Sequence, residues 1–475
     1  PLPMPSELYR QEFSTAEALQ NFDRLIAAAN LVFELNQDPI DDEPGQVDLP
    51  GVGRSAYAQL GIFLSAHCHV LLAIWDGKTT AEIGGTSQVV HFHHNDYMPG
   101  VTEKISAAQR DLADDESDLV FHVVCSRNRA NGDPPPELKV LDWYWYSKDP
   151  LIPLSKEIPD QHRKIFLRGS EFSEDAKRNY HRIQAEKQTL VSEQARQELP
   201  ESVSSIDRLF GIADWLAVYY KKLTIRTLLA THVAAFLMGL MFLLYSDFET
   251  RPLFMALFLL FFGCAAMTHW FARRQAWHRK YLEYRTLAEG LRVQFYWAAA
   301  GIRNEAKWRF AHDSYLQTQD PEFGWIRHVM RVAGTRYDAQ PTRTDFGLDY
   351  AIREWVGGGA QGQLGYYKKV ATDRMRKDVI TKLFDRTSLL VSGAAVVVFL
   401  SIGSSLSEKQ FTILFLIMGT TLLLYAIREG YSYATAVREL IKQYEFMLRI
   451  FDSAHRRLSD ANDADVKRQV LMALG

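Results

Sequence analysis

The sequence predicts an α/β head with a doubly wound parallel sheet, followed by an all-α body with four transmembrane helices in two hairpins. Two observations lead to this fold class. The first 150 residues alternate helical patterns with short apolar runs, as chains with parallel β-strands do. Beyond residue 220, the apolar residues gather in four long runs that are typical of membrane-spanning helices.

Length and composition limit the classes of protein to consider. A chain of 475 residues has room for about three domains. Its net charge of −3 excludes a strongly basic nucleic-acid binder, so we expect no nucleic acid as a partner. The three cysteines lie far apart (Cys68, Cys125 and Cys264), which excludes a disulfide scaffold.

The head begins with a helix and then alternates strands with helices. Ser14 is the expected N-cap of the first helix, with Glu17 at the capping-box position. We expect, in chain order, a helix over 14–34, a loop over 36–54, a helix over 55–68, a buried strand over 69–75, helices over 85–94 and 101–113, and a second buried strand over 118–125.

The four apolar runs decide the class of the body. They cover residues 227–245, 253–271, 388–403 and 411–427. A helix of about 20 residues crosses the hydrocarbon core of a bilayer, so the first pair is long enough and the second needs a few flanking residues. The alternative is two buried hairpins in a soluble bundle. Runs that stay apolar on every face for several turns disfavour it.

Charge around the runs predicts their orientation. The turns at 246–252 and 404–410 hold one basic residue each, Arg251 and Lys409. The opposite ends of the runs are rich in lysine and arginine, which stay on the cytoplasmic side. We therefore expect a plasma-membrane protein whose N- and C-terminal regions are both cytoplasmic.

The expected domains follow from these elements. They are a head over 1–150, a helical linker over 151–224, transmembrane hairpin 1 over 225–272, a cytoplasmic helical region over 273–387, transmembrane hairpin 2 over 388–428, and a cytoplasmic C-terminal helix over 429–475. Long charged helices are expected over 172–199, 275–316, 362–386 and 430–457.

One group of residues in the head has the pattern of a ligand site. Ligands bind beyond the carboxyl ends of parallel strands, and a glycine-rich helix start offers free N–H groups to an anion. An ordinary glycine turn is the alternative reading. The candidate ligand-binding residues are Trp75, Asp76 and Gly77 after the first strand, Gly84, Gly85 and Thr86 before the next helix, and Arg127 after the second strand.

The stretch LLAIWDG followed by GGTSQVV resembles the SLOG branch of the LOG-like Rossmannoid superfamily. The resemblance covers about residues 1–130. It implies a Rossmann-like head that binds a nucleotide-derived ligand, such as an ADP-ribose-type or cyclic nucleotide, with no further cofactor. It also implies a first βα unit before Pro1. Enzymatic relatives carry a catalytic Glu where this chain has Val89, so we predict no catalytic residue and no enzyme activity.

The body resembles the SLATT group of two-helix membrane effectors. The similarity lies in YLEYRTLAEGLRVQFYW at 281–297, directly after the first hairpin. The second hairpin, with its flank at 427–447, is interpreted as a diverged copy of the first. The sequence Tyr-Tyr-Lys-Lys at 219–222 indeed recurs at 366–369, although the distances to the following apolar runs differ.

The body also holds candidate pore or gating residues. His232 is an imidazole inside an apolar run, where a polar group is a candidate for function. Arg285, Glu289 and Arg292 lie at helical spacing on one face. The apolar residues that interleave with this ladder predict a helix–helix or subunit interface; they are Tyr284, Leu287, Leu291 and Phe295.

Two further clusters are interpreted as structural. His67, Cys68 and His69 stand near the first strand, and His91, His93 and His94 follow about 22 residues later. No carboxylate or CxxC pair completes a ligand set, so we predict no metal site. The aromatic run Trp143–Tyr146 is expected in the core or at a sheet edge.

Together, the resemblances imply a membrane effector that senses a nucleotide-derived signal and rearranges or permeabilises the membrane in bacterial antiphage defence. Its expected partners are the lipid bilayer, the small ligand and further copies of the chain in a homo-oligomer. The alternative is a membrane-anchored nucleotide-processing hydrolase, for which Glu82 and Asp76 are the acidic residues near Gly84. A scaffold without gating is a third possibility.

Overall fold

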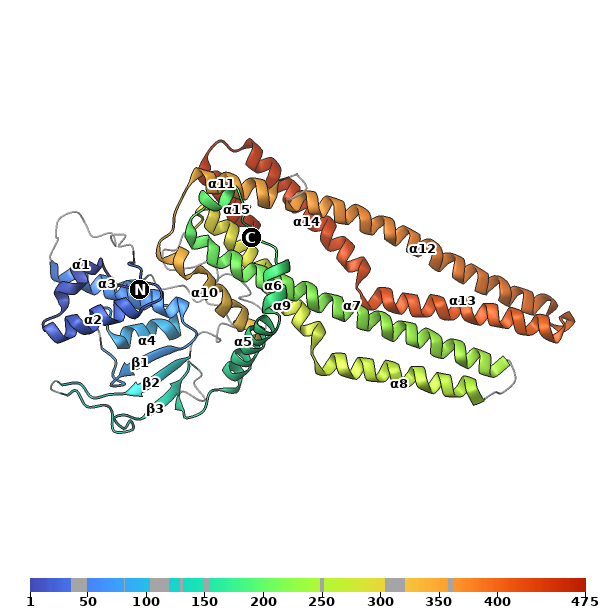
Figure 1. The fold of residues 1–475 in the computed structure, drawn as a ribbon, viewed down its shortest axis with the longest axis horizontal. Coiled ribbons are helices and arrows are strands. Elements are labelled where there is room, and N and C mark those ends of the chain that lie inside the picture. The colour runs from blue at the N-terminus through green and yellow to red at the C-terminus, as the bar shows by residue number, and fades with distance from the viewer. Residues whose placement is uncertain are drawn as a thin grey trace. The chain divides into compact units, whose positions relative to one another are not determined.

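The computed structural model describes residues 1–35, 49–80, 82–102, 119–128, 131–148, 154–247, 252–303, 321–357 and 362–475. The chain forms two compact units, and each combines two separate segments (Figure 1). The head unit contains Pro1–Trp215 and Thr286–Asp349. The hairpin unit contains Leu216–Arg285 and Tyr350–Gly475.

The head begins with the helices α1 (Ser6–Tyr9), α2 (Ala16–Ala28) and α3 (Leu49–His67), and a fourth helix, α4 (Thr86–Asn95), follows the first strand. The predicted cap of α2 is wrong by one residue. Thr15 has an extended backbone, and its hydroxyl accepts a hydrogen bond from the Ala18 amide at 3.2 Å. Ser14 precedes the cap, because only the residue with that extended conformation places its oxygen over the first turn.

The sheet of the head has four strands in the order β1-β2-β3-β4. Their bounds are Leu71–Trp75, Val120–Val124, Trp143–Tyr146 and Leu154–Ser155. β1 and β2 are parallel, as predicted, with Leu71 opposite Val120. β3 and β4 are antiparallel to their neighbours.

The expected doubly wound, Rossmann-like sheet is therefore not what the described chain shows. It shows a small mixed sheet with one parallel pair. After β2 the chain passes through three prolines at 134–136 and returns directly as β3. Proline lacks an amide hydrogen and disfavours helix, so this segment makes a hairpin instead of the helical crossover that a parallel strand needs. The aromatic run Trp143–Tyr146 is confirmed as part of the sheet.

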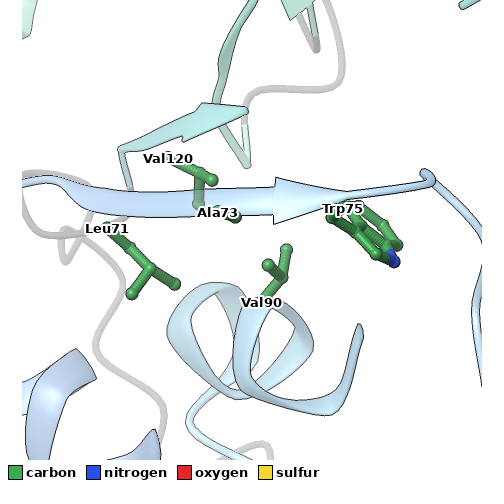
Figure 2. Packing of buried hydrophobic residues seen from close by; sticks show 5 residues of the cluster. All are labelled: Leu71, Ala73, Trp75, Val90 and Val120. Carbon is green, nitrogen blue, oxygen red and sulfur yellow. The ribbon is translucent and has the colours of Figure 1, made fainter. Parts of the chain in front are cut away.

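The core of the head lies between β1 and α4. Leu71, Ala73 and Trp75 point from one face of β1 towards Val90 of α4, and Val120 of β2 joins them (Figure 2). The alternate residues Leu72 and Ile74 are 63% and 62% exposed. In a strand, alternate side chains face opposite sides of the sheet. Within the described residues, one face of β1 is thus covered by α4 while the other remains apolar and open.

Two predicted head elements fall largely outside the described residues. The helix expected over 101–113 does so from residue 103, and the loop expected over 36–54 does so up to residue 48. From residue 49 the chain is helical, so α3 begins earlier than the expected residue 55.

The remaining helices of the head come from distant parts of the chain. α5 (Asp160–Arg178) and α6 (Tyr180–Glu186) follow the sheet, and α10 (Gly324–Ala339) arrives from the second segment. α10 packs against both α3 and α5. α11 (Asp345–Ala351) follows α10. Short 3₁₀ turns cover Arg10–Glu12, Ala195–Gln197, Glu201–Val203 and Pro321–Phe323.

Four long helices contain the predicted apolar runs and are candidates for the transmembrane segments. The apolar runs lie in α7 (Ser204–Asp247), α8 (Pro252–Arg274), α12 (Gln363–Ile402) and α13 (Glu408–Ala434). Each is long and apolar enough to cross a membrane, and at most 17% of the most apolar window of any of them is buried within the chain. Apolar side chains that the protein leaves uncovered are those that lipid would cover.

The two hairpins have the same order of elements, which supports the predicted repeat. Each is followed by an alanine in the left-handed region, Ala276 (φ 51°) and Ala436 (φ 48°). Each alanine starts a 24-residue helix, α9 (Trp277–Ala300) and α14 (Val437–Asp460). A left-handed alanine is uncommon, so its appearance at both positions is informative. The second copy continues into α15 (Ala464–Leu474).

A pair of tyrosines links the first and third helices of each copy. The rings of Tyr220 in α7 and Tyr284 in α9 lie 5.7 Å apart. In the second copy, the rings of Tyr367 in α12 and Tyr444 in α14 lie 5.9 Å apart. Tyr220 and Tyr367 hold the same place in the two Tyr-Tyr-Lys-Lys sequences, and Tyr284 and Tyr444 both stand eight residues after the left-handed alanine. The repeat is therefore present in side-chain packing as well as in helix order.

The hairpins pack against each other through α7 and α13. A Cβ added to Gly239 of α7 would meet Leu423 of α13 at 2.6 Å. Reciprocally, a Cβ added to Gly419 would meet Leu243 at 3.0 Å. Glycine permits this close backbone approach, which is a common device where membrane helices pack.

Candidate functional site

The candidate ligand site starts where β1 ends. Trp75 is buried and its indole N–H donates to the Lys78 carbonyl at 3.0 Å. Asp76 is fully buried, and one of its carboxylate oxygens accepts the Lys78 amide at 3.1 Å. Gly77 has φ +80°, and a Cβ there would meet Leu138 at 2.5 Å. The chain therefore needs glycine here both for backbone conformation and for space.

The start of α4 forms the second part of the site. Gly84 has φ +74°, and Gly85 is the N-cap, so no cap side chain covers the first turn. Nearby side chains bond to the loop instead. Gln88 accepts the Gly84 amide at 3.2 Å, and Ser87 accepts the Thr80 amide at 3.0 Å. These bonds hold the glycine loop while the N-terminus of α4, with Thr86 as its first residue, provides a positive dipole end.

Arg127 is the third part, and the structure gives it a partner that the sequence did not suggest. Its Nε lies 2.9 Å from a carboxylate oxygen of buried Asp76. Its backbone amide donates to the Gly132 carbonyl at 2.8 Å. The residues predicted from sequence around β1 and β2 are thus brought together at one edge of the sheet. At this edge the guanidinium of Arg127 forms an ion pair with the carboxylate of Asp76.

Val89 packs away from this edge. A Cβ added to Gly61 of α3 would meet Val89 at 2.4 Å, and Val89 also packs against the buried cluster around β1. Val89 is therefore part of the contact between α3 and α4. Glu82 is exposed and uses its carbonyl to accept the Gly85 amide at 3.1 Å.

The four gating candidates lie in two places: His232 contacts α13, and the three charged residues lie on α9. His232 of α7 donates from Nδ1 to the Leu228 carbonyl at 2.8 Å, and its ring lies 5.3 Å from that of Tyr431 in α13. Arg292 and Glu289 form an ion pair at 2.8 Å within α9. Arg285 lies on the same helix. The imidazole of His232 is thus held between the two hairpins.

The apolar residues of α9 are buried within the chain. Tyr284, Leu287, Leu291 and Phe295 are almost completely covered. Of the two predictions for this face, a helix–helix interface is confirmed and a subunit interface is wrong for these four side chains. A residue that its own chain already covers is not available to a second copy.

The two histidine clusters make separate contacts. His67 lies 3.0 Å from Asp338 of α10, and His69 donates to the His328 carbonyl at 2.9 Å. His93 is hydrogen-bonded to the Ser65 hydroxyl at 2.7 Å. In the part of the chain that the structure describes, no three His, Cys, Asp or Glu side chains are arranged to hold a metal ion.

Burial keeps several of these groups uncharged. It raises the pKa of the Cys68 thiol to about 11. Burial, together with His94 and Arg331, lowers the pKa of His93 to about 3. Burial and the charge of Arg331 also hold the pKa of His328 well below its usual range. Sequence reasoning missed His328 and Arg331, because nothing local connects α10 to residues near β1.

A scan against protein-family models, a search of curated proteins and a search of solved structures all find no match for this chain. The candidate site and the four apolar helices therefore carry the functional argument by themselves.

Proposed function

We propose that this protein is a membrane effector that binds a nucleotide-derived ligand in its head unit and responds through its two hairpins. One observation carries the proposal: the Asp76–Arg127 pair lies at the carboxyl end of β1, and the glycine-rich start of α4 is the next helix along the chain. A helix start attracts phosphate, and a buried carboxylate accepts hydrogen bonds from hydroxyl groups. A phosphorylated nucleoside has both features.

As an effector, the protein binds its ligand at this site and does not convert it. Val89 has no exchangeable proton and packs against α3. The carboxylate of Asp76 is already paired with Arg127, at 2.9 Å from its Nε. The resemblance to SLOG and SLATT proteins extends the proposal to bacterial antiphage defence, in which ligand binding would alter the membrane.

The proposal includes orientation and assembly. The charge asymmetry around the four helices supports cytoplasmic termini at the bacterial inner membrane. The open apolar face of β1, with Leu72 and Ile74, supports assembly of several copies, because such faces are usually covered. Cysteines introduced at Asp247 and Ser405 should react with an impermeant label in intact cells. Labelling only after permeabilisation contradicts the orientation.

The binding site is tested by Thr86→Asp, with Thr86→Asn as the matched neutral control. An acidic residue in the first turn stabilises a helix, so the fold should be retained, but its charge repels a phosphate. Calorimetry uses the full chain in nanodiscs, because the head unit combines two separate segments. We expect ADP-ribose or a cyclic nucleotide to bind wild type and Thr86→Asn, and binding to Thr86→Asp to fall at least tenfold. Equal binding by both variants contradicts the site.

The response is tested in liposomes that contain the full chain and a dye. We expect leakage with ligand in wild type and not in Thr86→Asp, and we expect chromatography to recover the ligand intact. Conversion of the ligand without leakage would support the membrane-anchored hydrolase instead.

A further inference from the structure

The most unusual charge in the head is that of Arg331 in α10. This residue is only 4% exposed. Among the residues that the structure describes, two of its guanidinium nitrogens, Nε and one Nη, are buried and have no hydrogen-bond acceptor. A buried cation without a partner is costly, because it loses its hydration and gains nothing in return. These two N–H groups can therefore donate hydrogen bonds to an added acceptor.

The groups around Arg331 are imidazoles from different elements. Its positive charge acts on His69 beside β1, on His93 of α4 and on His328 of α10. The rings of His69 and His328 are stacked 4.3 Å apart. His162 of α5 acts on both His93 and His328. Four elements that are distant in sequence thus converge on one buried, nitrogen-rich cluster.

The positive charge of this cluster favours an anion over a metal cation as its ligand. Arg331 is permanently positive, and Arg327 also acts on His328. The thiol of Cys68, which Arg331 also influences, is kept protonated by burial. A metal cation would meet repulsion from the guanidinium. An oxyanion would instead provide acceptors for the two unpartnered N–H groups, and imidazoles can donate further hydrogen bonds to it.

We propose that Arg331, with His69, His93, His162 and His328, forms a buried binding site for a phosphate group. The site is distinct from the proposed nucleotide site. His69 precedes β1 and His93 lies near the C-terminal end of α4, whereas the nucleotide site uses the opposite ends of both elements. The ligand is either inorganic phosphate or the phosphate of a small monoester, because both present the same oxygens to Arg331.

The experiment compares wild type with Arg331→Met in nanodiscs. Inorganic phosphate, glycerol 3-phosphate and chloride are titrated at equal ionic strength and pH 7.5, with thermal unfolding and calorimetry as readouts. We expect phosphate, the monoester or both to raise the unfolding midpoint of wild type. In Arg331→Met, the affinity should fall at least tenfold, because a charge-assisted hydrogen bond is lost. Binding of phosphate alone assigns the site to the free ion, and binding of the monoester assigns it to a metabolite.

Two controls separate a binding role from a structural one. Arg336→Gln changes an arginine on the same helix that is more exposed and paired with Glu201, and phosphate binding should be unchanged. In chloride alone, Arg331→Met should raise the unfolding midpoint, because it removes an unpaired buried charge. If Arg331→Met does not fold, His328→Gln replaces it, with the same expected loss of affinity.

The proposal is overturned if neither anion stabilises wild type, or if Arg331→Met (or His328→Gln in its place) binds the stabilising anion as tightly as wild type does. Thr86→Asp distinguishes it from the proposed nucleotide site, since that variant should bind phosphate normally. If Thr86→Asp loses phosphate binding, the ion binds at the start of α4, and the proposed phosphate site at Arg331 is wrong.

Discussion

Acid should destabilise the head unit through its buried imidazoles, and the size of the effect follows from their pKa values. Burial lowers the pKa of His93 to about 3 and keeps that of His328 well below its usual range. Both imidazoles are therefore neutral in the folded chain at pH 5.5, whereas an unfolded histidine with a pKa near 6.5 is protonated. The unfolded state binds more protons, so stability falls as pH decreases below 6.5, and it continues to fall towards pH 3 for His93.

The magnitude can be worked out for His93. At pH 5.5, one unit below the unfolded pKa, protonation favours the unfolded state by about 1 kcal/mol for an imidazole that stays neutral in the folded chain. His328 acts in the same direction. Above pH 7.5 neither group contributes, since both states are neutral.

The assay is urea unfolding of the full chain in nanodiscs, followed by tryptophan fluorescence at pH 7.5 and 5.5 in chloride buffer without phosphate. We expect the pH-dependent loss to shrink by about 1 kcal/mol in His93→Gln. The control is His181→Gln on α6, an exposed position, which should keep the wild-type dependence. An unchanged pH dependence in His93→Gln would refute the reasoning, because the neutral imidazole would then not be its cause.

Two further predictions concern side-chain contacts. Arg127→Ala should lower the free energy of unfolding by about 3 kcal/mol, because it leaves the buried Asp76 carboxylate without its cation. Urea titrations measure this loss. A loss below about 0.5 kcal/mol would contradict a stabilising role of the ion pair. Gly239→Leu should separate α7 from α13, since even a Cβ there would meet Leu423 at 2.6 Å. We expect a lower unfolding midpoint in nanodiscs, while Gly263→Leu, at a position with nothing within 4 Å, should leave it unchanged. Equal midpoints for the two leucine variants would contradict the packing of the hairpins.

The division of the chain affects how each of these variants should be studied. Both units combine segments that are separated in sequence, and α7, α9 and α11 each continue from one unit into the other. No single cut in the chain therefore releases either unit intact. Measurements on the full chain avoid this problem.

The sequence by itself determined the features that depend on neighbouring residues. The four apolar helices were predictable because the length and composition of a run are sufficient to specify a membrane span. The parallel pair β1 and β2 was predictable from two short apolar runs. The glycine turns at Gly77 and Gly84 were also predictable, since their backbone conformation is a local requirement.

Only the tertiary structure decided which distant residues meet. The return of β3 beside β2, the pairing of Arg127 with Asp76, and the packing of α10 on α3 all depend on contacts between separate elements. The cluster around Arg331 is the clearest case, because His69 and His328 stack although 259 residues separate them. Local periodicity indicates which face of an element is apolar. Which other element covers that face is decided by the packing of the whole core, and no short stretch of sequence contains this information.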